Sequence, residues 1–225
     1  MIPKIIHYCW FGKNEQPPLV KKCIANWRKT LPDYQIKLWD ETNSPMDIPC
    51  VKYAYKKKHW AFVSDYVRIY AVFHEGGIYL DTDTEVIRDF SPLLNNHCFV
   101  GFSQKRYVTN AVLGGEKGFH FLKDMLSFMD QMHSDKKSQL TSPKVTTAVL
   151  KKYGLNSYGE QLINGVKILP TEAFYPYNPF DPDRPLNNFF YEDVKPETYS
   201  VHHYMASWNK QTWIQKIINY IKSKK

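Results

Sequence analysis

Two aspartates, Asp81 and Asp83, follow a short apolar run, Ile78–Leu80, and are separated by one residue. Such a run predicts a buried strand, so both carboxylates lie at one strand end. Paired carboxylates form an oxygen-rich site for a hard divalent cation, which keeps part of its water and shares its remaining positions with substrate phosphates. The pattern therefore indicates an enzyme that uses a metal-bound phosphate ester, with a nucleotide-sugar as the leading candidate. The competing interpretation is a polar turn.

A second pair with the same spacing, Asp181 and Asp183, shows that spacing alone does not make a site. It lies in a proline-rich stretch, residues 178–185, with no predicted strand before it. A solvated loop is the better interpretation there. Context therefore separates the two pairs.

A helix predicted over residues 60–74 precedes the first pair. Asp65 and Arg68 share one helical face, and its flanking members are small or apolar, which indicates partial burial. Gly76–Gly77 supplies the left-handed conformation that closes a helix. We expect Asp65 and Arg68 to border the same cleft as the first aspartate pair, because a planar guanidinium suits phosphate or sugar hydroxyls. The alternative is an i,i+3 salt bridge on a helix surface.

These segments carry a resemblance to a known family. The stretches Ala61–Arg68 and Gly76–Asp83 resemble glycosyltransferase family 32, which includes yeast initiating mannosyltransferases and bacterial capsule and lipopolysaccharide transferases. That family is related to the catalytic domains of clostridial glucosylating toxins. The opening Ile2–Gly12 and the closing His202–Trp208 are similar to the family's first strand and last motif, in the same order. Asn110, in the stretch 109–115, is a weaker fourth match.

The resemblance implies an α/β fold of the GT-A type, with a mixed central sheet flanked by helices and one catalytic domain over residues 1–208. It implies a retaining hexosyl transfer from a nucleotide-sugar with Mn²⁺ or Mg²⁺. Among nucleotides a uridine diphosphate sugar is favoured, and a mannosyltransferase that uses guanosine diphosphate mannose is the alternative. The implied acceptor is a glycan or a lipid-linked oligosaccharide in bacterial surface polysaccharide synthesis.

The same resemblance assigns roles to individual residues. It places Trp10 against the base, Asp65 and Arg68 at the ribose and donor sugar, Tyr79, Asn110 and His202 in the donor site, Asp81 and Asp83 on the metal, and Ser207 and Trp208 over the diphosphate and metal. In the toxins one residue separates the corresponding serine and tryptophan, whereas here the two are adjacent.

The residues themselves leave some of these roles open. Trp10 ends a predicted strand, where ligands bind in open α/β sheets, and a core position is equally compatible with its sequence. His7 is better explained as a strand histidine with satisfied hydrogen bonds than as a ligand. His202 and His203 point to opposite faces if their segment is extended, so at most one of them reaches the site.

Alternating elements support the α/β class. The predicted strands are 2–10, 34–39, 78–81, 98–102 and 166–169, and the predicted helices are 17–29, 60–74, 118–132 and 143–152. The irregular, aromatic stretch 170–200 is expected to pack on the core and to form part of the acceptor side.

Composition argues against several classes of protein. The chain has 225 residues and 16% aromatic residues, and its four cysteines show no metal-type spacing. We see no signal peptide and no apolar stretch of spanning length, and we expect a cytoplasmic protein with reduced thiols. Nucleic acid is not an expected partner, because carboxylates dominate the central motifs. A glycoside hydrolase lacks its second, facing carboxyl group, but a non-catalytic basic or sugar-binding protein remains an alternative.

The last segment, 209–225, has five lysines and no acidic residue, and Trp213, Ile214, Ile217, Ile218 and Ile221 recur at helical spacing. This pattern is typical of an amphipathic helix that lies on an anionic membrane surface, here the inner face of the plasma membrane. A helix packed on the core with a basic end fits it about equally well.

Overall fold

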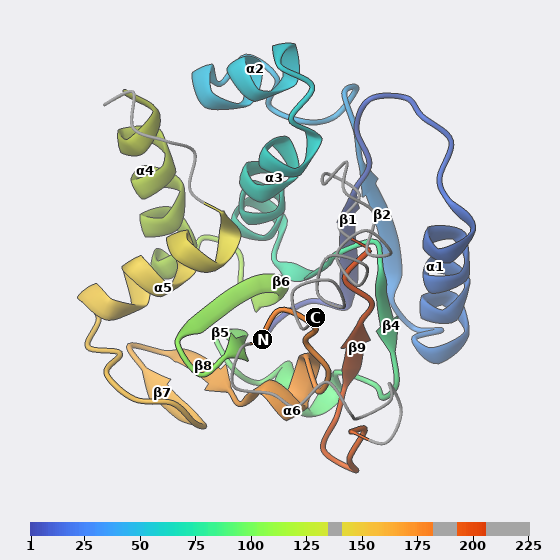
Figure 1. Ribbon diagram of the computed structural model, residues 1–225, viewed down its shortest axis with the longest axis vertical. Helices are drawn as coiled ribbons and strands as arrows, with labels where there is room; N and C mark the ends of the chain where they lie inside the picture. Colours follow the sequence, from blue (N-terminus) through green and yellow to red (C-terminus); the bar gives the residue numbers. More distant parts are fainter. Residues whose placement is uncertain (135–140, 182–192, 206–225) are drawn as a thin grey trace, which may run out of the picture.

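A computed structural model describes residues 1–134, 141–181 and 193–205, and Figure 1 shows a central sheet between two layers. The main sheet has seven strands in the order β2-β1-β3-β6-β5-β8-β7. They are β1 (Ile5–Cys9), β2 (Gln35–Trp39), β3 (Gly77–Leu80), β5 (Cys98–Gln104), β6 (Tyr107–Gly115), β7 (Gln161–Ile163) and β8 (Val166–Leu169). A separate ribbon pairs β4 (Thr84–Val86) with β9 (Ser200–His202).

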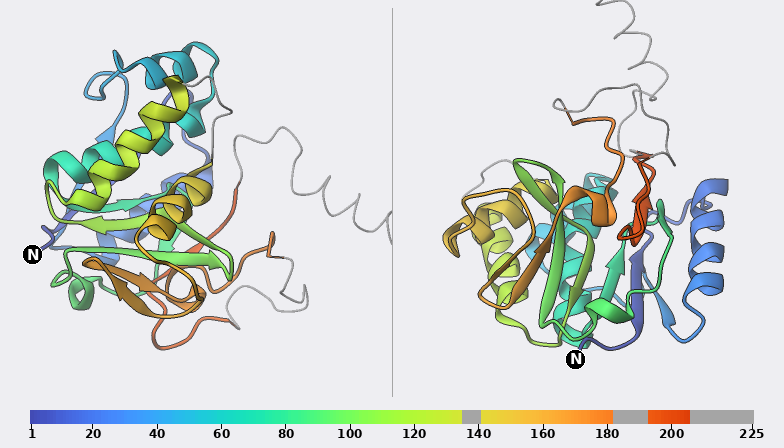
Figure 2. Two further views of the ribbon diagram at one scale, coloured as in Figure 1. Left: turned by 90° about the vertical axis from the view of Figure 1, so that its left-hand side faces the viewer. Right: turned by 90° about the horizontal axis from the view of Figure 1, so that it is seen from below.

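Helices cover both faces of the main sheet, as Figures 1 and 2 show. One layer holds α2 (Pro49–Lys56), α3 (Trp60–Glu75), α4 (His120–Ser134) and α5 (Ser142–Lys152). The other layer holds α1 (Pro18–Thr30), the short helices η1 (Ser91–Leu93) and α6 (Thr171–Phe174), and the β4–β9 ribbon. Each layer buries its own apolar cluster against the sheet. The predicted α/β class with a mixed sheet is confirmed.

Three neighbouring strands fix where the site forms. Both β2 and β3 pair with β1 in parallel, so the carboxyl ends of all three lie at one edge of the sheet. The next strand, β6, runs antiparallel to β3. The residues that follow β1, β2 and β3 are therefore brought together although they are far apart in the sequence.

The turn between α3 and β3 is built from two glycines. Gly76 has φ 71° and ψ −179°, a region that only glycine occupies freely, and its N–H donates to the carbonyl of Val72 at 2.8 Å. His7, which is buried in β1, contacts the Gly76 carbonyl through Nε2 at 2.7 Å. Its Nδ1 accepts a hydrogen bond from Trp39 Nε1 at 3.0 Å. The expectation that His7 has satisfied hydrogen bonds is confirmed, and burial lowers its pKa.

Every predicted strand and helix is present, within a few residues at its ends. Seven elements of the structure were not predicted: α2, β4, η1, β6, β7, α6 and β9. The omission of β6 matters most, because this strand forms the sheet's centre and carries Asn110. Its sequence mixes apolar, small and polar residues and ends in two glycines, so it lacks the alternation that marks a strand.

Parts of the stretch 170–200 pack on the core, as expected. Phe174 and Tyr175 are buried, and the Tyr175 hydroxyl accepts the N–H of Val112 at 2.8 Å. Tyr199 stacks on Phe90 with ring centroids 5.9 Å apart. The four cysteines are free thiols. Among the described helices, none has the length and apolar character needed to cross a bilayer.

Candidate active site

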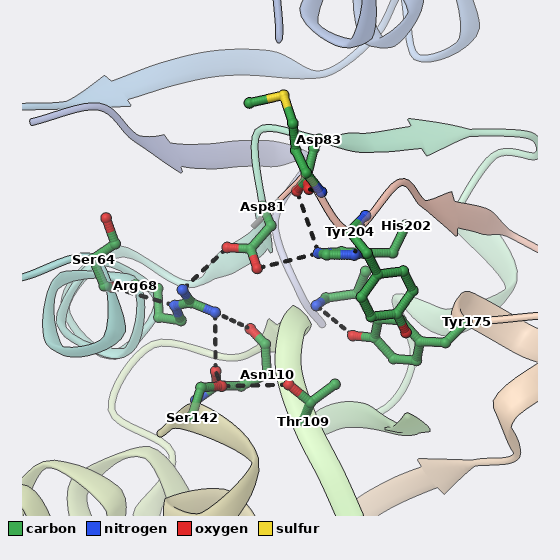
Figure 3. A network of polar contacts seen from close by, with 12 residues as sticks. Ser64, Arg68, Asp81, Asp83, Thr109, Asn110, Ser142, Tyr175, His202 and Tyr204 are labelled. Atoms are coloured by element: carbon green, nitrogen blue, oxygen red, sulfur yellow. Dashed lines mark hydrogen bonds and ion pairs between the residues drawn. The ribbon is translucent and has the colours of Figure 1, made fainter. Parts of the chain in front are cut away.

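The first aspartate pair lies at the end of β3, as predicted. All four residues of β3 are buried, and the Asp81 N–H continues the pairing with β6 by donating to the Ala111 carbonyl at 2.9 Å. The chain then turns, and the Thr84 N–H donates to the Asp81 carbonyl at 2.9 Å. This turn directs the Asp81 and Asp83 side chains toward a common point (Figure 3).

His202 reaches the same point from the other end of the chain. The β4–β9 pairing sets Thr84 opposite His202, and this register brings the imidazole to the aspartates. His202 Nε2 lies 3.5 Å from Asp81 Oδ2 and 3.3 Å from Asp83 Oδ1. One ligand atom from each of the three residues lies within 4.8 Å of the other two. Two carboxylate oxygens and one imidazole nitrogen form a donor set that fits a divalent metal ion.

The neighbouring His203 faces away from this point. Its Nε2 lies 3.0 Å from Glu85 Oε2, and its N–H donates to the Asp83 carbonyl at 2.9 Å. The prediction that at most one of the two histidines reaches the site is confirmed, and that residue is His202.

Backbone groups hold the turn after His202 against the site. The Tyr204 N–H donates to His202 Nδ1 at 3.2 Å, and the Met205 N–H donates to Asp83 Oδ2 at 2.7 Å. Because Nδ1 accepts, the His202 ring proton is on Nε2, between the two carboxylates. Tyr204 has φ 51°, an uncommon conformation for a bulky residue.

Arg68 connects α3 to the aspartate pair. Its NH2 group lies 2.9 Å from Asp65 Oδ1 and 3.1 Å from Asp81 Oδ1, and its side chain is only 6% exposed. NH1 donates to Asn110 Oδ1 at 3.2 Å, and Nε donates to the Ser64 carbonyl at 3.2 Å. Asp65 and Arg68 thus lie beside Asp81, as expected. In this structure the guanidinium contacts protein atoms, and its contact with a donor stays a prediction.

Tyr79 completes the surroundings of Asp81. The Arg68 guanidinium lies over its ring, 4.7 Å from the centroid, and its hydroxyl donates to Asp81 Oδ1 at 2.9 Å. Tyr79 is 1% exposed, and its described polar contacts are with Arg68 and Asp81. Its predicted place in the nucleotide pocket stays untested.

The two carboxylates next to Arg68 have different acidities. Burial would raise the pKa of Asp81, but Arg68, His202 and the Tyr79 hydroxyl outweigh it, and the pKa is lowered. Burial dominates at Asp65 and raises its pKa to about 6, although Arg68 acts in the opposite direction. Asp81 is therefore held ionised at neutral pH, which is the state that a metal ligand requires.

Sequence reasoning missed Ser142, the first residue of α5. Its hydroxyl donates to Asn110 Oδ1, lies 3.4 Å from Thr109 Oγ1, and is buried. The signal was a serine directly before Pro143, a favoured start for a helix. Within the described part of the chain, Asn110 Nδ2 is a buried donor without a hydrogen-bond partner.

Trp10 lies directly after β1, at the same edge of the sheet as Asp81. Its ring is half-buried against the apolar cluster beneath α1, and its Nε1 donates to the Asn14 carbonyl at 2.7 Å. Stacking on a base therefore stays a prediction. Ser207, Trp208, Asp183 and the segment 209–225 lie outside the described residues.

Comparisons with known proteins agree with this geometry. Residues 17–100 match the family described as a glycosyltransferase sugar-binding region containing a DXD motif. A lactosylceramide 4-alpha-galactosyltransferase of Rattus norvegicus is 32% identical over 200 residues, which is 80% of this chain and 51% of that protein. The same enzyme of Pongo pygmaeus is 35% identical over 162 residues, covering 67% of this chain and 68% of the relative. Inositol phosphoceramide mannosyltransferase 3 of Schizosaccharomyces pombe is 33% identical over 129 residues, covering 54% and 35%.

Solved structures show the same fold. The galactosyltransferase LgtC, in complex with donor and acceptor sugar analogues, superposes with a TM-score of 0.54 at 12% identity over 98% of this chain and 95% of its own. The PaToxG glycosyltransferase superposes with a TM-score of 0.56 at 18% identity over 67% and 69%. These are GT-A glycosyltransferases, so the predicted fold type is confirmed.

The chain spans 51% of the rat relative's length, and 42% of that of the human one. The extent and identity of the matches nevertheless settle the family, and the DXD motif of its sugar-binding region is Asp81-Thr82-Asp83 in this chain. The chain belongs to the DXD-containing glycosyltransferases of family 32.

Proposed function

We propose that this chain transfers a sugar from a nucleotide-sugar to a glycan or lipid acceptor, with a bound divalent cation. The observation that carries the proposal is the convergence of Asp81, Asp83 and His202 at the end of β3. A cation held there would supply the charge that neutralises a diphosphate leaving group. The mixed oxygen and nitrogen donor set favours Mn²⁺ over Mg²⁺, because Mg²⁺ prefers oxygen ligands.

The chain's own residues prepare this site before any donor arrives. Arg68 and the Tyr79 hydroxyl fix Asp81 Oδ1, which leaves Oδ2 to face His202 and Asp83. Asp65 offers a second carboxylate beside Arg68, which is buried and placed to accept hydrogen bonds from hydroxyls of the donor. The unpartnered amide of Asn110 is a further donor on the same network. Such fixed groups need little rearrangement when substrate binds.

The finer specificity is also part of the proposal. We favour a uridine diphosphate sugar, transfer of a hexosyl group with retention, and a role in surface polysaccharide synthesis. The relatives named for lactosylceramide and inositol phosphoceramide support a lipid-linked acceptor, since both names specify a glycolipid or phospholipid of ceramide. The mannosyltransferase among them keeps guanosine diphosphate mannose as the alternative donor.

A screen of nucleotide-sugars for slow hydrolysis tests the donor and the metal together. The wild-type chain should release the nucleotide from one donor, stop in chelator, and recover with Mn²⁺. Asp83→Asn should reduce the rate at least about a hundredfold, because a charged carboxylate ligand is replaced by a neutral amide. Asp181→Ala is the matched control, since it removes an aspartate of the other pair, which lies in the turn that starts at Asn178. Full activity in chelator, or in Asp83→Asn, would refute the metal-dependent mechanism.

We further propose that the protein works in the cytoplasm, where nucleotide-sugars are made, and that 209–225 contacts the inner face of an anionic membrane. The lysines and the tryptophan–isoleucine stripe of this segment support that contact. A chain that ends at Trp208 should bind anionic vesicles more weakly than the full chain does. If the shortened chain is insoluble instead, the segment belongs to the core.

A further inference from the structure

Positive charge is concentrated in two stretches of this chain. Residues 48–64 carry four lysines and residues 209–225 carry five, and neither stretch contains an aspartate or glutamate. The nine lysines exceed the net charge of the whole chain, which is +8. The remainder is therefore close to neutral. The four lysines of the first stretch lie in the described part of the structure, on α2 and the turn that follows it.

The lysines of this stretch share one exposed surface. The helix α2 buries Val51 and Ala54 against the core. The opposite face and the turn after it are exposed, and we call this surface the α2 basic face. Its residues are Lys52, Tyr53, Lys56, Lys57 and Lys58.

None of these four lysines makes an ion pair with another described residue. Other lysines do: Lys37 lies 2.6 Å from Glu75, and Lys21 lies 2.5 Å from Glu15. Lys57 Nζ lies 5.9 Å from the centroid of the Tyr53 ring, and Tyr53 is 48% exposed. The surface thus combines uncompensated charge with an aromatic side chain at its centre.

Topology sets this surface at the same end of the molecule as the candidate active site. The helix α2 follows the carboxyl end of β2, which lies at the same edge of the sheet as the carboxyl end of β3. The helix α3 then leads from α2 back into the sheet, with Asp65 and Arg68 near its middle. Figure 1 shows α2 beyond the end of α3, at the top of the view.

We propose that the α2 basic face docks on an anionic lipid bilayer. Lysines on long stems suit a diffuse negative surface, whereas recognition of a single phosphate or carboxylate favours the planar fork of arginine. A tyrosine among them matches the boundary between headgroups and acyl chains. Docking there would turn the end that holds Asp81 and Asp83 toward the membrane. The surface is distinct from the segment 209–225, and membrane binding through it does not depend on the proposed sugar transfer.

Vesicle co-sedimentation of the full chain tests the proposal. The protein is mixed with phosphatidylcholine vesicles, with and without phosphatidylserine, at low and high salt. We expect binding only to the anionic vesicles, weaker at high salt. Lys52→Glu/Lys56→Glu/Lys57→Glu should weaken it by roughly tenfold to a hundredfold, as expected for lysines within reach of an anionic leaflet.

A charge-matched variant separates this surface from net charge. Lys22, Lys29 and Lys151 are exposed on α1 and α5, so Lys22→Glu/Lys29→Glu/Lys151→Glu changes the total charge equally. It should bind vesicles almost as the wild type does, and all three proteins should hydrolyse a soluble donor at the same rate. The proposal is overturned if the wild type does not bind anionic vesicles, if the α2 variant binds them as well as the wild type, or if both triple variants lose the same affinity. It is also overturned if the α2 basic face binds RNA in preference to anionic vesicles.

Discussion

Apart from the proposed cation, Asp81 and Asp83 contact different groups of the protein. Asp81 is an ion-pair partner of buried Arg68, whereas Asp83 accepts the Met205 N–H and faces His202. Removing Asp81 leaves a buried guanidinium with Asp65 as its remaining carboxylate. We therefore expect Asp81→Ala to lower the free energy of unfolding by about 3 kcal/mol, the scale for breaking a buried ion pair.

Urea denaturation of Asp81→Ala and Asp83→Ala measures this difference. Asp83→Ala should lose no more than about half as much stability, because Asp83 has no contact with the buried Arg68 guanidinium and faces an imidazole instead. Equal losses would show that Asp81 contributes little to the charge balance of Arg68. The comparison also identifies Asp83 as the cleaner position for testing metal-dependent activity.

The ring proton of His202 gives a second prediction. Nε2 can bind a cation only without its proton, so the proton must move to Nδ1, which then cannot accept the Tyr204 N–H. Saturating Mg²⁺ should switch the His202 tautomer and shift the Tyr204 amide resonance. Long-range ¹H–¹⁵N spectra of the imidazoles measure both.

The control for this titration is His97, an exposed histidine that contacts Glu116 at 2.7 Å and has no part in the site. Its tautomer should not respond to Mg²⁺. If His202 keeps its proton on Nε2 at saturating Mg²⁺, it is not a ligand of that ion, which then rests on the two aspartates alone.

A third prediction concerns the Trp10 ring. If its ring stacks on the base, Trp10→Ala should weaken binding of uridine diphosphate with Mn²⁺ by about 1–3 kcal/mol. Calorimetry measures the affinity, and Trp10→Phe should retain most of it. Unchanged affinity in Trp10→Ala would leave the residue as a part of the apolar cluster beneath α1.

The sequence predicted which residues gather but not how they are paired. Asp65 and Arg68 were expected beside Asp81, because helix period and strand end are readable from the chain. The choice of His202 over His203 was not readable, because it depends on which face β9 turns to β4. The link from Ser142 to Asn110 joins residues 32 positions apart, and no local pattern announces it.

The turn between α3 and β3 is the element that positions Asp81. Gly77 has φ 109°, and a Cβ there would lie 2.7 Å from the Ile5 carbonyl oxygen, which belongs to the backbone. Gly77→Ala would therefore push β3 away from β1 as well as adopt an unfavourable φ. We expect a loss of at least about 3 kcal/mol in unfolding free energy.

Gly118 provides the matched control for the Gly77 prediction. Its φ is 75°, but a Cβ there would meet no atom within 4 Å. Gly118→Ala should lose only about 1–2 kcal/mol, the contribution of backbone conformation alone. Thermal denaturation of both variants separates the two contributions, and equal losses would mean that β3 can move away from β1 without penalty.

Elements with a regular pattern were predictable, and those stabilised only by tertiary contacts were not. The helix α3 has a clear period and a glycine stop, and both were predicted. The ribbon strands β4 and β9 have three residues each, too few for a pattern. They form because residues from distant parts of the chain meet, which a local pattern cannot show.

At the scale of the whole molecule, the site is assembled from two distant parts of the described chain. Asp81 and Asp83 follow a strand at the centre of the main sheet, whereas His202 arrives on β9, which pairs only with β4. A two-stranded ribbon is marginal on its own, so β9 should open more easily than β3, which has a neighbour on each side.

Hydrogen exchange followed by mass spectrometry tests this difference. Amides of Ser200–His202 should exchange much faster than those of Gly77–Leu80 in the absence of a divalent cation. Mn²⁺ should slow exchange in β9, since a ligand that binds only the closed form stabilises it, and leave β3 almost unchanged. Asp83→Asn should abolish the slowing, and Asp181→Ala should not. If β9 is as well protected as β3 in the absence of metal, the site is preassembled, and cation binding is not needed to hold His202 against the two aspartates.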